Sequence, residues 1–428
     1  MTITDAMAPG VEAFRPAFRQ STNEPTWLAN FRRAGVEQFS ATGLPTTKDE
    51  RWKYTSLRPL ARANYLPVGP KEISAPERML EGAAQAVFVN GCFSHEASDL
   101  SGLDGFVGSF RNMAGDNWIE ELLTSTPFAS QAMYSLNSAA FVDGLAVKLG
   151  NNEQLPRPLE LVFVSMPGNS PGMWHPRVAV DLGCNSAATI VERHISMGGG
   201  SYFANHATDI RVRDGGRLVH AKVQQEGTDG RHLSMARVRV AENSFYDSFT
   251  LTLGGSLSRS ETEVRIEGTG AEVRLNGCYI ISGRQHADHT SRIDHLAPGT
   301  TSRQVFAGAI DGAARGVFQG HIVVDKAAQQ TDGHQMNRAL LLSDRAEIDS
   351  KPILEIYADD VKCSHGATAG DIDEDHLFYL RARGIPAAAA RNLVVRGFLA
   401  DPIENLSNEY VQAALLAALD SHLGLEHL

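Results

Sequence analysis

The chain has 428 residues, a formal net charge of −11 at pH 7 and 7% aromatic residues. A length well beyond that of one compact core predicts two or three structural units. The acidic balance argues against a nucleic-acid surface, which needs clustered Lys and Arg to displace counterions.

The four cysteines, Cys92, Cys184, Cys278 and Cys363, are scattered singly along the chain. This spacing is unlike a disulfide framework or a CxxC metal knuckle, and it favours a reducing compartment. The N-terminal sequence MTITDAMAPGVEAF has no basic segment followed by an apolar one. No uninterrupted apolar run reaches the roughly 18 residues that a membrane span needs. We therefore expect a cytoplasmic protein.

Residues 1–145 are predicted to form a mixed, mostly helical region. The segment NEPTWLANFRRAGVEQF has a capping residue at Asn23 and a proline, Pro25, near the first turn. Trp27 and Phe31 follow at helical spacing. These features predict an amphipathic helix that packs on a neighbouring element.

Residues 146–362 change to short alternating β segments separated by Gly, Asn and Asp. Examples are RVAVDLG, ATDIRVRDGG, RVRVAENS, SFTLTLGG, TEVRIEGTG, AEVRLNG and GHIVVDK. Turn points recur near Gly183, Gly215, Asn243 and Gly268, at intervals typical of a repeat architecture. No helix of crossover length follows a strand, which disfavours a doubly wound sheet. A β-sandwich and a parallel β-helix both remain open on spacing alone.

The final region, residues 363–428, is predicted to be helical. Asp373 can cap a helix that ends at Gly384, before Ile385 and Pro386 start the next one. A last helix runs through EYVQAALLAAL. The residues expected to face inward are Leu377, Phe378 and Leu380 in the first of these helices and Val411, Leu415 and Leu419 in the last.

The sharpest candidate site is the pair Cys363 and His365, at the end of an extended segment. Residues i and i+2 of a strand share a face, so both side chains can reach one ligand. A thiolate and a neutral imidazole both bind iron or zinc. Two ligands are too few for a tetrahedral site, so a complete site needs further ligands from elsewhere. An inert, partly buried cysteine at a strand end is the alternative interpretation.

A second candidate is the segment HADHTSRIDH, with His286, His289, Asp294 and His295. Three such ligands and an open position would suit a zinc hydrolase. The HExxH motif is absent, however, and a β segment would send His286 and His289 to opposite faces. Polar side chains hydrogen-bonded along a strand are the alternative that we favour.

The triple glycine at 198–200 predicts a flexible turn, since no GK pair follows to complete a phosphate loop. No GxSxG nucleophile elbow is present either. We therefore expect no enzymatic activity. If the function of this protein depends on ATP hydrolysis, another subunit must carry out that hydrolysis.

Four segments together resemble the SufB/SufD family of iron–sulfur cluster assembly subunits. They are RWKYTSL, HTSRIDHL, GVFQGHIVVDKAAQQTDGHQMNRALLLSD and LEIYADDVKCSHGATAGDIDEDHLFYLRARGIP. The resemblance covers most of the chain, densely from about His289 onward. Within the family, the KCSHGATAG segment and the chain length favour the SufD type over the SufB type. The alternative for RWKYTSL is a purely structural role, as a loop whose Trp52 and Tyr54 pack between hydrophobic surfaces.

The resemblance implies a right-handed parallel β-helix between two helical regions. It implies a non-enzymatic scaffold that pairs with a SufB paralogue through the β-helix and binds the SufC ABC-type ATPase through its C-terminal helices. Cys363 and His365 would help to hold transient iron or a nascent cluster, with no cofactor stably bound to the isolated chain. Whether the isolated chain forms a homodimer, and whether iron or reduced flavin binds it, stays open.

The rival hypothesis is a stand-alone β-helix enzyme, either a polysaccharide lyase or a metal-dependent hydrolase that uses the His286 to His295 segment. Such enzymes line a groove with carboxylates, arginines and exposed aromatics. Only 7% of this chain is aromatic, which disfavours that hypothesis.

Overall fold

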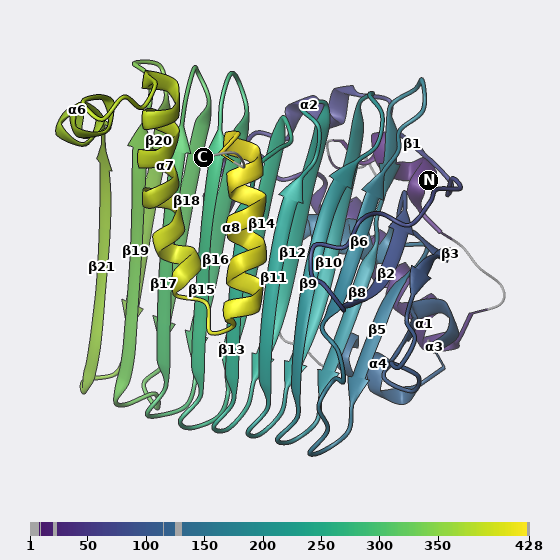
Figure 1. Cartoon of the computed structure of the whole chain (residues 1–428). Helices are drawn as coiled ribbons and strands as arrows, with labels where there is room; N and C mark the ends of the chain where they lie inside the picture. Colours follow the sequence, from purple (N-terminus) through teal and green to yellow (C-terminus); the bar gives the residue numbers. More distant parts are fainter. Residues whose placement is uncertain (1–7, 9, 20–23, 114, 125–130, 426–428) are drawn as a thin grey trace.

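The computed structural model describes residues 8, 10–19, 24–113, 115–124 and 131–425. Its core is a parallel β-helix of about eight turns, built from two facing sheets (Figure 1). The predicted mainly β fold is confirmed, with helical elements before and after the core. Of the two all-β solutions that the strand spacing left open, the β-helix is the one that forms.

Successive strands along most of the core alternate between the two sheets, so each turn of the β-helix gives one strand to each sheet. The first sheet contains β1 (Leu66–Pro67), β4 (Val107–Ser109), β5 (Gly144–Leu149), β7 (Gly172–Trp174), β8 (Arg177–Leu182), β10 (Tyr202–Val212), β12 (Gly230–Val240), β14 (Leu257–Ile266), β16 (His286–His295), β18 (Arg315–Val324) and β20 (Glu347–Ile356). The second contains β2 (Ala84–Val89), β3 (Cys92–Asp99), β6 (Leu159–Ser165), β9 (Ala187–Ser196), β11 (Arg217–Gln225), β13 (Phe245–Thr252), β15 (Glu272–Ile281), β17 (Thr301–Ile310), β19 (Thr331–Leu341) and β21 (Val361–Gly370).

The strands pair in an unbroken register, so similar side chains are aligned from one turn of the β-helix to the next. Ile210, Val238, Val264, Ile293 and Ile322 are aligned on consecutive strands of the first sheet, and each is at most 1% exposed. β-Branched side chains suit this pleated, buried surface. Burial of each such aliphatic side chain stabilises the folded state by roughly 1.5–3 kcal/mol relative to leaving it exposed. The register therefore fixes which residues face the interior along the whole core.

The turns that carry the chain from the first sheet to the second need left-handed backbone conformations. Asn185, Gly215, Asn243 and Gly270 have φ angles of 54°, 68°, 53° and 70°. Glycine adopts this conformation without strain, and asparagine tolerates it better than most residues. These positions lie within two residues of the turn points predicted from the sequence.

The N-terminal region packs on the outer face of the first sheet. Its helical elements are η1 (Glu12–Ala17), α1 (Thr26–Thr42), η2 (Glu50–Trp52), α2 (Arg58–Arg62), α3 (Phe110–Met113), α4 (Asn117–Thr124) and α5 (Ala132–Ala140). Phe14 and Phe39 pack with Phe203 and Leu233 of the sheet. The predicted amphipathic helix is α1, which Pro25 precedes; its expected cap, Asn23, lies outside the described residues. Strands β2 to β5 also fall within the first 149 residues, so this region is not helical alone.

The C-terminal helices α7 (Ala387–Glu404) and α8 (Glu409–Leu423) cover the outer face of the second sheet (Figure 1). The predicted stripe of Val411, Leu415 and Leu419 is fully buried there, against residues such as Phe249 and Cys278. These three residues therefore pack against the chain's own core. The expected burial of Cys278 within a strand is confirmed.

The helix α6 (Glu374–Arg381) differs from its prediction. Asp373 caps it as expected, since its side chain accepts hydrogen bonds from the backbone amides of Asp375 and His376. The inward-facing role expected for Phe378 is wrong, because this side chain is exposed, whereas Leu377 and Leu380 are half-buried. Phe378 is 74% exposed and its neighbour Tyr379 is 56% exposed. Two adjacent aromatic side chains of α6 are therefore left uncovered by the rest of the described chain.

The predicted start of the helical C-terminal region, at residue 363, falls inside a strand. β21 continues through Gly370, and the first helix begins only at Glu374. Small residues in GATAG gave no apolar periodicity, but the ladder with β19 holds them extended. Among the described residues, no helix is long and apolar enough to cross a membrane.

Because α8 seals the second sheet, we expect the replacement Leu415→Ala to lower the free energy of unfolding by about 2–5 kcal/mol, through lost burial and a residual cavity. Phe378→Ala is the matched control, since an exposed side chain should change stability by no more than about 0.5 kcal/mol. Urea unfolding followed by circular dichroism measures both. Equal effects from the two variants would contradict the packing described here.

Candidate functional site

Cys363 and His365 lie on the last strand of the second sheet, on the side that faces the interior of the β-helix. In the β19–β21 ladder, Cys363 is opposite Gly333 and His365 is opposite Gln335. Gln335 is 2% exposed and points inward, and residues paired in register point to the same side. The two candidate ligands therefore share one face, as expected.

None of the described strands pairs with the outer edge of β21, which leaves this pair at the open end of the β-helix (Figure 1). His365 is exposed, whereas Cys363 is partly buried and packs near Ile322 and Val324. Burial raises the pKa of the Cys363 thiol, and the nearby Asp332 adds to the rise. The isolated chain thus presents a neutral thiol and an accessible imidazole.

The surface around this open end carries exposed apolar side chains. The outer edges of its last strands also carry backbone groups without a strand partner in the described chain. Ile356 and Tyr357 are 41% and 62% exposed, and Met336 is 38% exposed. β20 and β21 are the outermost strands of their sheets, so each has a ladder partner on one side only. An uncovered strand edge with apolar neighbours is a natural place for another chain to pair.

The structure does not bring His286, His289, Asp294 and His295 together. His289 stacks on Tyr279 in the interior, with 5.3 Å between the ring centroids. The ring nitrogens of His295 contact two neighbouring hydroxyl groups at 2.7 and 2.9 Å. Asp294 forms an ion pair with an arginine at 2.8 Å. As favoured from the sequence, these polar side chains are engaged in separate contacts with their neighbours, and within the described part of the chain none of them belongs to a group that could hold a metal ion.

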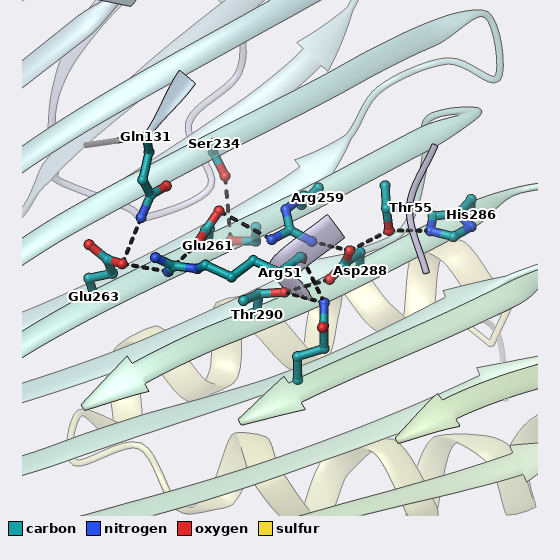
Figure 2. Close-up of polar contacts among 12 residues, drawn as sticks. Arg51, Thr55, Gln131, Ser234, Arg259, Glu261, Glu263, His286, Asp288 and Thr290 are labelled. Atoms are coloured by element: carbon teal, nitrogen blue, oxygen red, sulfur yellow. Dashed lines mark hydrogen bonds and ion pairs between the residues drawn. The ribbon is translucent and has the colours of Figure 1, made fainter. Parts of the chain in front are cut away.

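The RWKYTSL segment is fixed to the outer face of the first sheet by a buried ion-pair network (Figure 2). The guanidinium of Arg51 contacts the carboxylates of both Glu261 and Glu263 on β14. Burial alone would lower the pKa of Arg51, but the two carboxylates outweigh it and raise that pKa. Burial also raises the pKa of Glu263, which Arg51 partly offsets.

A second part of the network links the same segment to β16. Thr55 donates a hydrogen bond to Asp288 and lies 2.9 Å from the Nε2 atom of His286 (Figure 2). Arg259 pairs with Asp288 and lies over the ring of Trp52, with 4.0 Å to the ring centroid. Sequence reasoning gave only the aromatic part of this segment. The polar residues of the RWKYTSL segment attach the N-terminal region to the β-helix core.

The interior of the β-helix holds polar residues that sequence reasoning missed. One side of the interior, where the first sheet leads into the second, is lined by Ile, Leu and Val. The opposite side carries buried His194, His206 and His232 together with Glu192 and Glu226. Glu192 and His194 lie on β9, His206 on β10 and His232 on β12, and Glu226 directly follows β11. Only an alignment of successive turns of the β-helix could have shown from the sequence that they meet.

The fold and the site define a class of protein: a parallel β-helix with helical flanks and an open end that carries a thiol and an imidazole. Two family models match, the SufBD protein N-terminal region over residues 19–161 and the SUF system FeS cluster assembly, SufBD core domain, over residues 164–398.

Relatives extend these matches over nearly the whole chain. The iron–sulfur cluster assembly protein SufD of Escherichia coli is 32% identical over 91% of each chain. An iron–sulfur cluster assembly SufBD family protein of Synechocystis is 28% identical, covering 95% of this chain and 93% of its own. SufD of Bacillus subtilis is 23% identical, covering 96% and 97%. The chain therefore belongs to the SufB/SufD family of iron–sulfur cluster assembly proteins and is of the SufD type.

The ion-pair network predicts a pH-dependent effect of Arg51→Ala. Removing the cation leaves Glu261 and Glu263 buried side by side, which should cost about 2–4 kcal/mol at pH 8 once the partial exposure of Arg51 is discounted. The pKa of Glu263 is already raised and should rise further. A carboxyl whose folded-state pKa exceeds its unfolded value binds its proton more tightly when folded, so the loss should shrink as pH falls toward 5.

Urea unfolding at pH 8 and pH 5 measures this difference. Arg33→Ala is the matched control, because Arg33 pairs with Glu37 on the surface and both side chains are about 70% exposed. A pH-independent loss for Arg51→Ala would contradict the role of the two buried carboxylates.

Proposed function

We propose that this chain is a scaffold subunit of a cytoplasmic iron–sulfur cluster assembly complex and has no catalytic turnover of its own. Family membership supports the assembly role. The four free thiols are consistent with a reducing compartment. In this proposal iron and sulfide are cargo, received and passed on by the complex, and another subunit hydrolyses ATP.

The observation that carries the proposal is the open end of the β-helix with Cys363 and His365 on its interior-facing side. The partner that fits this end is a SufB paralogue with a β-helix of the same kind, because its own terminal strands can continue both ladders. Pairing would bring ligands of the partner to a site that two residues cannot complete. Iron or a nascent cluster would then be held between the two subunits.

The proposed contact for the SufC ATPase is α6. The stripe of Val411, Leu415 and Leu419 on the last helix is not available for this contact, because it is buried against the second sheet. Phe378 and Tyr379 instead stand out from α6. Exposed aromatic side chains are typical anchors of protein interfaces. We infer that α6 carries this contact and that α7 and α8 attach it to the core.

The rival hypothesis of a β-helix hydrolase loses its main support, because His286, His289, Asp294 and His295 are engaged in separate contacts. A polysaccharide lyase would need an exposed row of aromatic and charged side chains along the sheets. The C-terminal helices cover the outer face of the second sheet instead. The scaffold proposal is therefore the one that we retain.

The site assignment predicts the effect of His365→Ala in a complex assembled with both partners. The complex should keep its subunit stoichiometry, because the backbone edges are unchanged, and should lose iron or cluster by at least about tenfold, because a ligand is gone. Native mass measurement and iron analysis check the two parts. His95→Ala, at an exposed histidine of β3, is the control. Full iron content in the His365 variant would overturn the assignment.

The ATPase contact predicts that the double variant Phe378→Ala, Tyr379→Ala binds SufC at least about tenfold more weakly while remaining folded. Leu66→Ala on β1 is the matched control, since Leu66 is 52% exposed but lies near the other end of the β-helix (Figure 1). Titration with purified ATPase measures both affinities. Unchanged binding by the double variant would remove α6 from the interface.

A further inference from the structure

Three buried histidines meet in the interior of the β-helix, far along the core from Cys363. His194 lies on β9, His206 on β10 and His232 on β12, and they are 0%, 4% and 1% exposed. One ring nitrogen from each lies within 4.8 Å of one from every other. The ring centroids are separated by 4.5, 4.6 and 4.9 Å. The group therefore draws on both sheets and on two successive turns.

Register explains why the three side chains converge. His232 is opposite Ala204 in the β10–β12 ladder, so it lies diagonally next to His206 on the same inward face. His194 comes from the facing sheet, a few residues before the turn at 197–201 that leads into β10. The arrangement is fixed by the rigid core and needs no loop to form it.

The outer nitrogens of two of these rings are held by buried carboxylates. Nε2 of His194 forms a hydrogen bond of 3.3 Å with Glu192. Nδ1 of His232 lies 2.7 Å from Glu226, which is within ion-pair distance although the two groups are not aligned for a hydrogen bond. Glu192 is in turn held by His220 at 3.0 Å. Carboxylates of this kind orient metal-bound imidazoles and fix their tautomer.

The other ring nitrogen of each of these two histidines has no hydrogen-bond partner within the described part of the chain. Nδ1 of His194 and Nε2 of His232 are buried and have no hydrogen-bond partner among the described residues. A buried polar atom without a partner costs free energy, and such atoms are rare in native proteins. A cation bound between the rings would satisfy both atoms at once.

Buried charged groups also lie around the three rings. Glu192 contacts His194 and lies 3.8 Å from the ammonium of Lys222, and Glu226 contacts His232. Both carboxylates are therefore placed behind the imidazoles, where they can orient them toward a bound cation.

We propose that His194, His206 and His232 form a second metal site, which binds a divalent first-row transition cation such as Zn(II) or Fe(II) inside the β-helix. Three imidazoles with carboxylates behind them match the ligand preference of these ions. Metal–nitrogen bonds of about 2.0–2.1 Å place the ligand atoms of a tetrahedral site roughly 3.4 Å apart. The three nitrogens, which lie within 4.8 Å of one another, must therefore move closer together by ring rotation when the cation binds. The site belongs to this chain alone and does not depend on the open end.

Cobalt(II) titration of the full-length chain, first stripped of metal with a chelator, tests the proposal. We expect one high-affinity ion per chain with visible absorption bands of a low-coordinate Co(II) centre. The double variant Cys363→Ala, His365→Ala should bind it equally well, which separates this site from the one at the open end. His206→Asn and Glu226→Gln should each weaken binding by about tenfold or more.

His289→Asn is the matched control, because His289 is another inward-facing histidine, 3% exposed and stacked on Tyr279, that lies outside the group. It should bind Co(II) as the unchanged chain does. X-ray absorption of the zinc-loaded chain supplies a readout that does not depend on any variant folding, and it should show nitrogen and oxygen ligands without sulfur. Sulfur ligation, loss of binding in the Cys363 and His365 double variant, or unchanged binding in both His206→Asn and Glu226→Gln would overturn the proposal.

Discussion

The structure depends on one constraint, the continuous in-register pairing of parallel strands along two sheets. Each strand satisfies the backbone groups of the strand before it and leaves its own outer edge for the next. The pairing also stacks side chains of one kind, as in the aliphatic column through Ile210 and Val264. Everything placed on the core, from the ion-pair network to the candidate ligands, takes its position from this register.

The two chain ends finish the core in different ways. The N-terminal region is attached to the first sheet by charged and hydroxyl groups around Arg51 and Thr55, in addition to aromatic packing. The C-terminal helices attach to the second sheet through aliphatic residues such as Leu415. Both outer faces are thus covered by the chain's own helices, whereas Phe378 and Tyr379 of α6 and the apolar residues of the last strands are exposed in the described part of the chain.

Much of this could be predicted because it rests on local rules. Strands, turn positions and the Asp373 cap follow from β-branched alternation, left-handed turn residues and side-chain capping. Period-two alternation also placed Cys363 and His365 on one face. The exposure of Phe378 could not be predicted, since apolar spacing does not say whether a helix packs on its own chain. The group around His206 was missed because its members meet only through the register between turns, which no single segment encodes.

The open end of the β-helix has a consequence for local stability. In a linear array, an inner unit is held by two neighbours and a terminal unit by one, so fraying begins at the ends. α7 packs mainly on β15 and β17, which leaves the strand with Cys363 and His365 dependent on the β19 ladder. In the proposed complex, a paralogue docked there would supply the missing neighbour. Assembly and the ordering of the proposed ligand pair would then be a single thermodynamic event, and amide hydrogen exchange on β21 would report how far it has proceeded.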